Sequence, residues 1–147
     1  MGENIDANEI GEKVLRLEME HAEAIEYVRE ICLDSGFGIP VEFSPSELLN
    51  EKVDANRDPL YVLGACNPAI ADQALEETLD IAALFPCNMI IREVEPGVQE
   101  VHHVSIMRIA RLVGMAPDSE SWQAIIAETG ELTENTFATL QANQASD

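Results

Sequence analysis

Basic residues are scarce in this chain, which has 8 lysines and arginines against 28 aspartates and glutamates, a formal net charge of −20. Lysine occurs only at Lys13 and Lys52. This balance argues against nucleic acid and anionic membranes as partners, because binding to phosphates requires a basic surface. Self-repulsion at this charge density destabilises a compact chain unless salt screens it. We therefore interpret the composition as that of a halophilic protein, adapted to a salt-rich cytoplasm.

Long apolar runs, a secretion signal and paired cysteine motifs are also missing. No run approaches the ~18 apolar residues of a membrane-spanning helix. The first twenty residues are acidic and lack the apolar segment of a signal peptide. The three cysteines, Cys32, Cys66 and Cys87, include no CxxC pair, and their odd number fits reduced thiols better than a disulfide framework. We expect a cytoplasmic protein.

The 147 residues suit one domain with its own hydrophobic core. Hydrophobic periodicity predicts an α+β fold with a mainly antiparallel sheet packed against helices. We expect a flexible acidic segment over residues 1–12, a single domain over 13–140 and a frayed tail over 141–147. Strands are expected at 13–19, 39–43, 60–66, 87–94 and 98–104. Helices are expected at 21–35, 45–53, from Pro68, at 106–113, and after a cap at Asp118, where Gly130 can break the last helix.

The most pointed chemical feature is the segment Gly64-Ala-Cys-Asn-Pro68. It places Cys66 at the end of an expected strand, directly before the expected N-cap of a helix at Asn67. The positive end of a helix stabilises anions, so a reactive thiolate is one interpretation of Cys66. Gly64 would let a ligand or a second backbone approach closely. The other interpretation is that Cys66 is a small buried residue that ends a central strand.

A second Cys-Asn pair occurs in Pro86-Cys-Asn88. Cys87 begins an expected strand and shares a face with Met89 and Ile91, which predicts that it is buried. A proline flanks each pair, and both asparagines can hydrogen-bond the backbone and so fix the two turns against each other. The alternatives are two structural turns or one shared site with two thiols and two amides. Cys32 falls on the apolar stripe of a helix and is expected in the core.

Histidines and catalytic motifs give little support to a metal site or a known enzyme class. His102 and His103 are neighbours in an expected strand, so their side chains point to opposite faces and cannot both bind one ion. One of them could join Cys66 or Cys87 in a mixed site, although the spacing matches no zinc motif. The sequence contains no P-loop, no G-x-G-x-x-G, no H-E-x-x-H and no G-x-S-x-G, which are the signatures of several large enzyme classes. We expect no cofactor and no bound metal.

These turns and their flanks resemble the domain-of-unknown-function 302 family. The similar stretches are Tyr61–Ala71, Ala74-Leu75, Leu84–Glu93 and the helix-to-strand junction Ser35–Gly38, within a resemblance that covers about residues 14 to 140. The acidic composition suggests a haloarchaeal member. The resemblance implies a decorated single copy of the TATA-binding-protein-like fold and a homodimer, with no established activity. Likeness of fold does not imply DNA binding.

The family motif maps onto a set of residues that we expect to bind a ligand: Gly64, Cys66, Asn67, Pro68, Pro86, Cys87 and Asn88. Family members commonly have Asp-Pro after the second strand of the hairpin, where this chain has Ser105-Ile106, so a shared catalytic role is weakened. The leading hypothesis is a homodimeric module that binds a small molecule near the two turns. The alternatives are a redox enzyme or sensor that uses Cys66 with Cys87, and a protein that binds a soft metal or haem through Cys and His.

Overall fold

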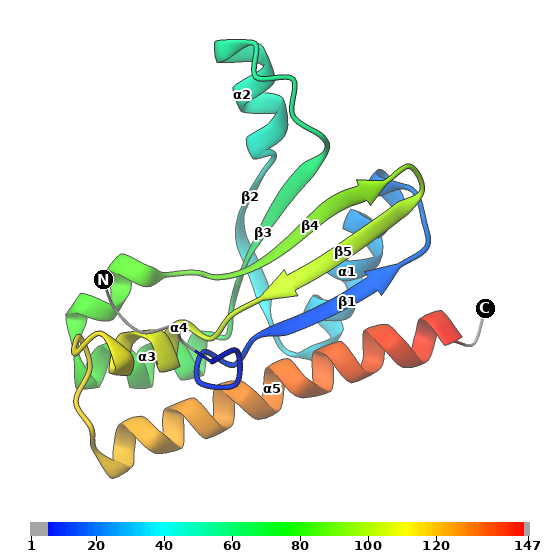
Figure 1. The fold of residues 1–147 in the computed structure, drawn as a ribbon. Helices are drawn as coiled ribbons and strands as arrows, with labels where there is room; N and C mark the ends of the chain where they lie inside the picture. The colour runs from blue at the N-terminus through cyan, green and yellow to red at the C-terminus, as the bar shows by residue number, and fades with distance from the viewer. Residues whose placement is uncertain (1–5, 146–147) are drawn as a thin grey trace.

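The computed structural model describes residues 6–145 and contains a five-stranded sheet with the order β1-β5-β4-β3-β2 (Figure 1). All four strand pairings are antiparallel, as the sequence predicted for most of the sheet. The elements in chain order are β1 (Lys13–Leu17), α1 (His21–Ser35), β2 (Gly38–Phe43), α2 (Pro45–Val53), β3 (Leu60–Cys66), α3 (Pro68–Glu77), the 3₁₀ helix η1 (Leu79–Leu84), β4 (Cys87–Glu95), β5 (Val98–His103), α4 (Ile106–Leu112) and α5 (Glu120–Ala145).

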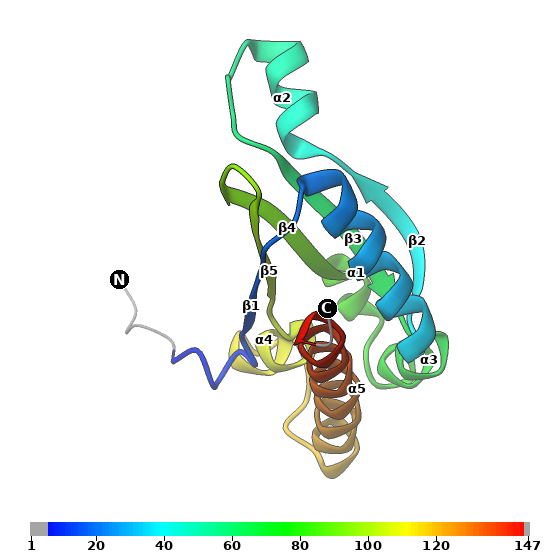
Figure 2. The same ribbon diagram turned by 90° about the vertical axis from the view of Figure 1, so that its right-hand side faces the viewer.

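One face of the sheet is covered by α1 and α5 (Figure 2). Alternate strand residues point to that face, because side chains alternate between the two faces of a strand. Leu63 of β3, Met89 and Ile91 of β4 and Val101 of β5 are fully buried there. A second cluster of apolar residues fills the space between α3, η1, α4 and the first half of α5. The molecule therefore has two adjoining cores, and α5 packs against both.

Side-chain caps start α2 and α3 where the sequence predicted them. The Ser44 hydroxyl accepts a hydrogen bond from the N–H of Glu47 at 3.1 Å, and Pro45 takes the first helical position of α2. Gly36, which ends α1, has a left-handed φ of 113°, a conformation that glycine adopts without steric cost. Capping and turn chemistry thus confirm the boundaries of α1 and α2.

Two expectations near the C-terminus were wrong. The cap of α5 is Ser119, whose hydroxyl accepts from the N–H of Trp122 at 3.2 Å, and not Asp118. Gly130 does not break α5, which is continuous from Glu120 to Ala145. Residues 141–145 continue this helix, and residues 146–147 of the expected tail lie outside the described residues. Packing of the α5 stripe against both cores overrides the low helix propensity of one glycine.

The expected flexible N-terminal segment lies partly outside the described residues, which begin at Asp6. Residues 7–11 form a turn, and the N–H of Ser105 donates to the carbonyl of Ile10 at 2.7 Å. That hydrogen bond ties the turn to the start of α4. Across residues 6–145 no helix is long and apolar enough to span a membrane.

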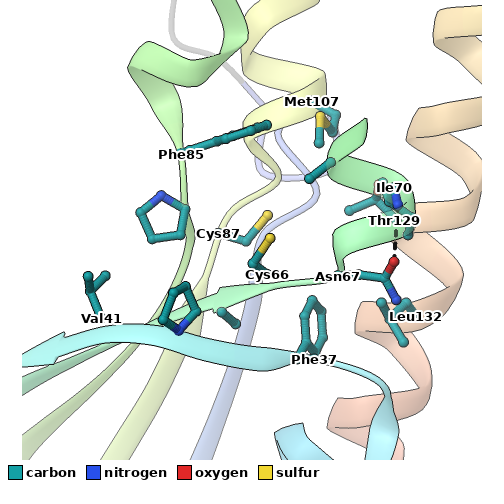
Figure 3. Close-up of a pocket in the computed structure, with 14 residues that line it drawn as sticks. Phe37, Val41, Cys66, Asn67, Ile70, Phe85, Cys87, Met107, Thr129 and Leu132 are labelled. Atoms are coloured by element: carbon teal, nitrogen blue, oxygen red, sulfur yellow. Dashed lines mark hydrogen bonds between the residues drawn. The ribbon is translucent and has the colours of Figure 1, made fainter. Parts of the chain in front are cut away.

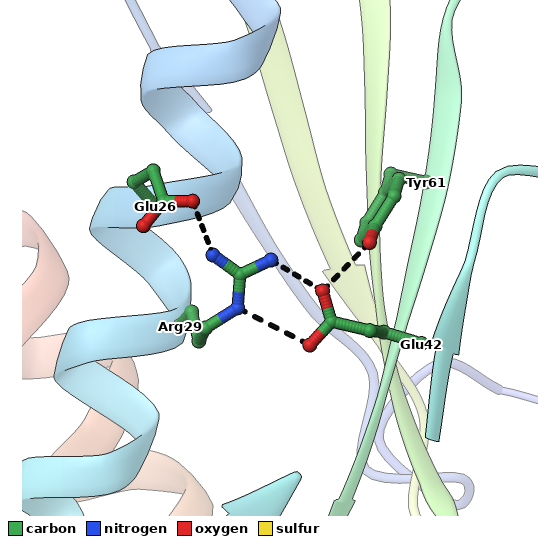
Figure 4. Close-up of polar contacts among 4 residues, drawn as sticks. All are labelled: Glu26, Arg29, Glu42 and Tyr61. Carbon is green, nitrogen blue, oxygen red and sulfur yellow. Dashed lines mark hydrogen bonds and ion pairs between the residues drawn. The ribbon is translucent and has the colours of Figure 1, made fainter.

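The edge strand β2 is bulged between Gly38 and Val41, as the sequence predicted. Beyond the bulge, Glu42 pairs with Arg29 of α1 and accepts a hydrogen bond from the Tyr61 hydroxyl at 2.6 Å (Figure 4). Arg29 also pairs with Glu26 on its own helix. The hydrogen bonds from Arg29 and Tyr61 lower the pKa of Glu42. This cluster fixes β2 to α1 and sets the position of Val41.

Candidate functional site

The two Cys-Asn turns line one cavity of about 220 Å³ (Figure 3). It lies where the two cores meet. Phe37, Pro40 and Val41 form one side, and the connection after η1 supplies Phe85 and Pro86. The remaining walls come from the end of β3, the start of β4 and the helices α3, α4 and α5. The expectation that the two turns are spatial neighbours is therefore met, because Ala65 of β3 pairs with Cys87 of β4 in the sheet register.

Gly64 permits the close packing that forms one wall of this cavity. A Cβ atom at Gly64 would lie 2.6 Å from Cγ of Pro86 and 2.6 Å from Cγ2 of Val41. Real Cβ atoms do not approach other atoms so closely, so these neighbours would have to move. Gly64 itself does not line the cavity. Its role is to let Pro86, which follows a cis peptide bond, and the edge strand β2 approach the sheet.

The two asparagines have different roles. Oδ1 of Asn67 accepts from the N–H of Ile70 at 3.0 Å, and Nδ2 donates to the carbonyl of Gly36 at 3.0 Å. Asn67 thus caps α3 and ties it to the end of α1. Asn88 is exposed, and within residues 6–145 its side chain makes no hydrogen bond, although its backbone carbonyl binds His103. Asn67 hydrogen-bonds the backbone as predicted, but its partners are Ile70 and Gly36 and not the second turn, so the prediction that the two asparagines fix the turns against each other was wrong.

Both thiols belong to the cavity wall, and they differ in burial. Cys87 is 9% exposed and Cys66 is partly exposed. Burial raises the pKa of Cys87 to about 12, with a smaller contribution of the same sign from Cys66. Cys87 is therefore a protonated thiol at neutral pH. Burial also raises the pKa of Cys32 to about 12, and this residue lies in the core, as predicted.

The other polar side chains of the wall already have hydrogen-bond partners. Asn67 uses its amide on Ile70 and Gly36, as described above. The Thr129 hydroxyl donates to the carbonyl of Ile125 at 2.8 Å. The remaining lining is aliphatic, aromatic or thioether, and includes Phe37, Phe85 and Met107. The cavity therefore offers mostly apolar contact and two thiols to an occupant.

A comparison with known families identifies the family of this chain. The model of the family described as a domain of unknown function, DUF302, matches residues 13–140. The chain belongs to the DUF302 family. A similar fold occurs in the crystal structure of an uncharacterized conserved DUF302 protein from Bacillus stearothermophilus, with a TM-score of 0.73, 22% identity, and coverage of 86% of this chain and 95% of that chain. At this identity the likeness concerns the fold alone. No curated protein matches the chain.

The residues that the sequence assigned to a ligand site divide into two groups in this chain. Cys66, Asn67, Pro86 and Cys87 line the cavity, whereas Gly64, Pro68 and Asn88 do not. Pro68 occupies the first turn of α3, where its missing N–H costs nothing. The motif thus combines residues that face the cavity with residues that shape its walls.

Histidines are absent from the lining of this cavity among the described residues. His103 lies on the buried face of β5 and lines a different cavity. Within residues 6–145 no three His, Cys, Asp or Glu side chains are grouped closely enough to hold a metal ion. The mixed Cys/His arrangement considered from the sequence is therefore not assembled in this DUF302 domain.

Sequence reasoning missed the apolar residues that complete the cavity, chiefly Phe37, Phe85, Met107 and Leu132. Met107 and Leu132 fall on amphipathic stripes, where the default expectation is core packing. Phe85 lies in the connection between η1 and β4. Whether its side chain lines the cavity depends on the path of that connection across the sheet. No spacing in the sequence distinguishes an apolar residue beside a cavity from one inside a filled core.

Proposed function

We propose that this DUF302 domain is a cytoplasmic module that binds a small, mostly apolar molecule between its two Cys-Asn turns. The observation that supports it is a single apolar cavity that both turns line, with Cys66 and Cys87 in its wall. A cavity of about 220 Å³ exceeds the engineered apolar cavities of about 150 Å³ that bind benzene. Phe37, Phe85 and Met107 favour an aromatic or branched aliphatic occupant, since aromatic rings and thioethers pack well against such groups.

The apolar character of the ligand follows from the satisfied polar groups of the wall. A ligand with many hydrogen-bonding groups would lose its water and find few partners, because Asn67 and Thr129 are already bonded. The two sulfur atoms, which Figure 3 shows on the same side of the cavity, are weak hydrogen-bonding groups. They contribute soft, polarisable contact.

Binding of toluene, followed by amide NMR, tests the proposal with matched variants of α3. Ala71 lines the cavity, whereas Ala69 is exposed on the same helix. We expect toluene to shift the amide signals around Cys66 and Cys87 in the unmodified protein and in Ala69→Met. We expect Ala71→Met to abolish these shifts, because the added side chain fills the cavity. Absence of saturable shifts in the unmodified protein, or equal binding by both variants, would contradict the proposal.

We also propose that the module is a homodimer that associates through β2 and α2. β2 is an edge strand, and such edges present unpaired backbone groups. Val41 and Phe43 on β2, and Leu48 and Val53 on α2, have exposed fractions between 48% and 65%. Light scattering in molar KCl should give twice the 16.1 kDa chain mass, and Phe43→Lys should shift it toward one chain. A single-chain mass for the unmodified protein would refute the dimer.

The strand order and antiparallel pairing support the likeness to the TATA-binding-protein fold that the family resemblance implies. The likeness is one of architecture and carries no inference of DNA binding. The acidic composition supports a halophilic, haloarchaeal setting.

A thiol redox function is the second candidate, because both thiols line one cavity. Oxidation by a peroxide would join Sγ of Cys66 to Sγ of Cys87, with two electrons and two protons passing to the peroxide to form water and an alcohol or a second water. Mass spectrometry after hydrogen peroxide treatment should show loss of two hydrogen atoms in the unmodified protein and in Cys32→Ser. The loss should not occur in Cys66→Ser. If Cys66 forms only sulfinic or sulfonic acid, the redox pair does not exist.

A further inference from the structure

A second cavity, polar and about 820 Å³ in volume, lies between the N-terminal turn, the end of β5, the start of α4 and the middle of α5. Its lining includes His103, Arg108, Lys13 and Gly130. None of these residues lines the apolar cavity beside the cysteines. Neither the family motif nor the proposed function involves it.

His103 is a buried hydrogen-bond acceptor in the wall of this polar cavity. The residue is 2% exposed, and Nδ1 lies 2.9 Å from the carbonyl oxygen of Asn88. A carbonyl oxygen only accepts, so Nδ1 carries the proton and donates it to this bond, which leaves a lone pair on Nε2. Nε2 is buried and has no partner among the described residues. Burial lowers the pKa of His103, which keeps the ring neutral at pH 7.

An unmatched buried acceptor is costly, because the nitrogen has lost its water without gaining a hydrogen bond. The missing partner must be a donor, such as a hydroxyl group. A side chain of the protein does not supply it within residues 6–145. His103 belongs to the lining of the cavity, and because Nε2 has less than 1 Å² of accessible surface, a ligand reaches it from there once the neighbouring side chains shift.

Two cations of this acidic protein line the same cavity without a carboxylate partner. Arg16, Arg29 and Arg92 all form ion pairs with glutamate. In the described part of the chain no ion pair involves Lys13 or Arg108, and Arg108 Nη1 donates to the carbonyl of Asn8 at 3.4 Å. Guanidinium and ammonium groups at a partly enclosed site favour a carboxylate.

The acidic side chains of the cavity restrict the charge of the ligand. Glu12, Glu131 and Glu134 also belong to the lining, and all three residues are exposed. They repel phosphate and dicarboxylates more strongly than a singly charged carboxylate. Among the anions that Lys13 and Arg108 can bind, a small monocarboxylate meets the least repulsion from these three carboxylates.

Gly130 keeps the wall of α5 open at this cavity. It lies inside a 26-residue helix, where glycine is less stable than alanine. No heavy atom would come within 4 Å of a Cβ atom at Gly130. Close packing therefore does not require glycine here, and the open space in front of it belongs to the cavity.

We propose that this second cavity binds a small hydroxy monocarboxylate, whose hydroxyl donates to Nε2 of His103 and whose carboxylate is held by Arg108 and Lys13. The assignment rests on the unmatched histidine nitrogen, the two cations without ion pairs and the unfilled space at Gly130. It is independent of the apolar cavity and of its thiols.

The test compares lactate with propionate, which has the same carbon chain and carboxylate but no hydroxyl. Both sodium salts are titrated at constant ionic strength while the ring nitrogen signals of His103 are followed by ¹⁵N NMR. We expect lactate to bind about tenfold more tightly than propionate, since only its hydroxyl satisfies the buried acceptor. The Nε2 signal should move on lactate binding and stay nearly constant with propionate.

Matched variants give a second measure that does not alter the buried histidine. Arg108→Gln should weaken lactate binding about tenfold, whereas Arg111→Gln, the same change on the same helix outside the lining, should leave it unchanged. Gly130→Leu should abolish binding by filling the cavity. Equal affinity for lactate and propionate, equal binding by the two arginine variants, or no binding by the unmodified protein would each overturn the proposal.

Discussion

Asn67 and Asn88 follow a cysteine in the same way but differ in what their side chains contact. Asn67 joins the first turn of α3 to the end of α1 through two hydrogen bonds. Asn88 is exposed at the start of β4. Its backbone carbonyl, and not its side-chain amide, accepts a hydrogen bond from His103. Likeness in sequence therefore does not make the two residues equivalent.

Replacement of these asparagines should separate their contributions to stability. We expect Asn67→Ala to lower the free energy of unfolding by about 1–2 kcal/mol, because the cap and the bond to Gly36 are both lost. Asn88→Ala should change it by less than about 0.5 kcal/mol, as is usual for an exposed residue. Urea denaturation of the two variants in the same salt measures the difference. Equal losses would show that the Asn67 bonds do not stabilise the fold.

At the scale of elements, the placement of β2 decides the shape of the apolar cavity. β2 is held at one point by the ion pair of Glu42 with Arg29, and at another by close packing of Val41 over Gly64. Both contacts join elements that are distant in the sequence. The cavity is thus a product of how the edge strand is fixed to α1 and β3.

The ion pair of Glu42 predicts a dependence of stability on pH. Arg29 and Tyr61 lower the pKa of Glu42 in the folded protein below its usual 4.5. The contribution of the Glu42 carboxylate to folding stability is therefore fully present above pH 4.5. It is lost as the pH falls through the pKa of Glu42 in the folded protein. We expect Glu42→Gln to lower stability by about 1 kcal/mol at pH 7, with a difference that diminishes as the pH falls below 4.5.

The control for this pH dependence is Glu95→Gln, which removes an ion pair with Arg16 in which both side chains are about 60% exposed. Exposed pairs contribute little, so this variant should follow the unmodified protein across the pH range. If Glu42→Gln lost the same stability at pH 3 as at pH 7, the carboxylate would not be the stabilising group.

Two glycine-to-alanine substitutions should change the stability of the protein in opposite directions. Gly64→Ala forces contacts of 2.6 Å with Pro86 and Val41, and such overpacking costs about 1–3 kcal/mol. Gly130→Ala meets no atom within 4 Å and should stabilise α5 by about 1 kcal/mol through helix propensity. Thermal unfolding of both variants measures this. Stabilisation by Gly64→Ala would mean that the wall of the cavity yields without cost.

At the scale of the whole molecule, the net charge of −20 dominates the response to solvent. Screening lengths fall to about 3 Å in 1 M salt, so repulsion among surface carboxylates is then largely removed. We expect the urea midpoint to rise between low and molar KCl. An unchanged midpoint would contradict halophilic adaptation, whereas a rise with KCl but not with sucrose at equal osmolality would identify screening as the cause.

Local signals were sufficient to predict most elements of this fold. Ser44, Gly36 and Asn67 define helix ends through groups only a few residues away, which is why those boundaries could be read from the sequence. The continuity of α5 through Gly130 could not be predicted from the sequence, because it depends on packing against two cores. Of the residues predicted for the candidate site, Cys66, Asn67, Pro86 and Cys87 line the cavity, whereas Phe37, Phe85 and Met107, which the fold brings to it, were missed.

Periodicity and composition were enough to predict the α+β composition, the antiparallel pairing of most strands, the burial of Cys32 and Cys87 and the acidic surface. The tertiary structure decided that Cys66 and Cys87 share one apolar cavity and that His103 faces a different one. It also decided that Gly64 serves packing and that Gly130 borders open space. The physical reason is that cavities form between elements far apart in the chain, where no local pattern records their spacing.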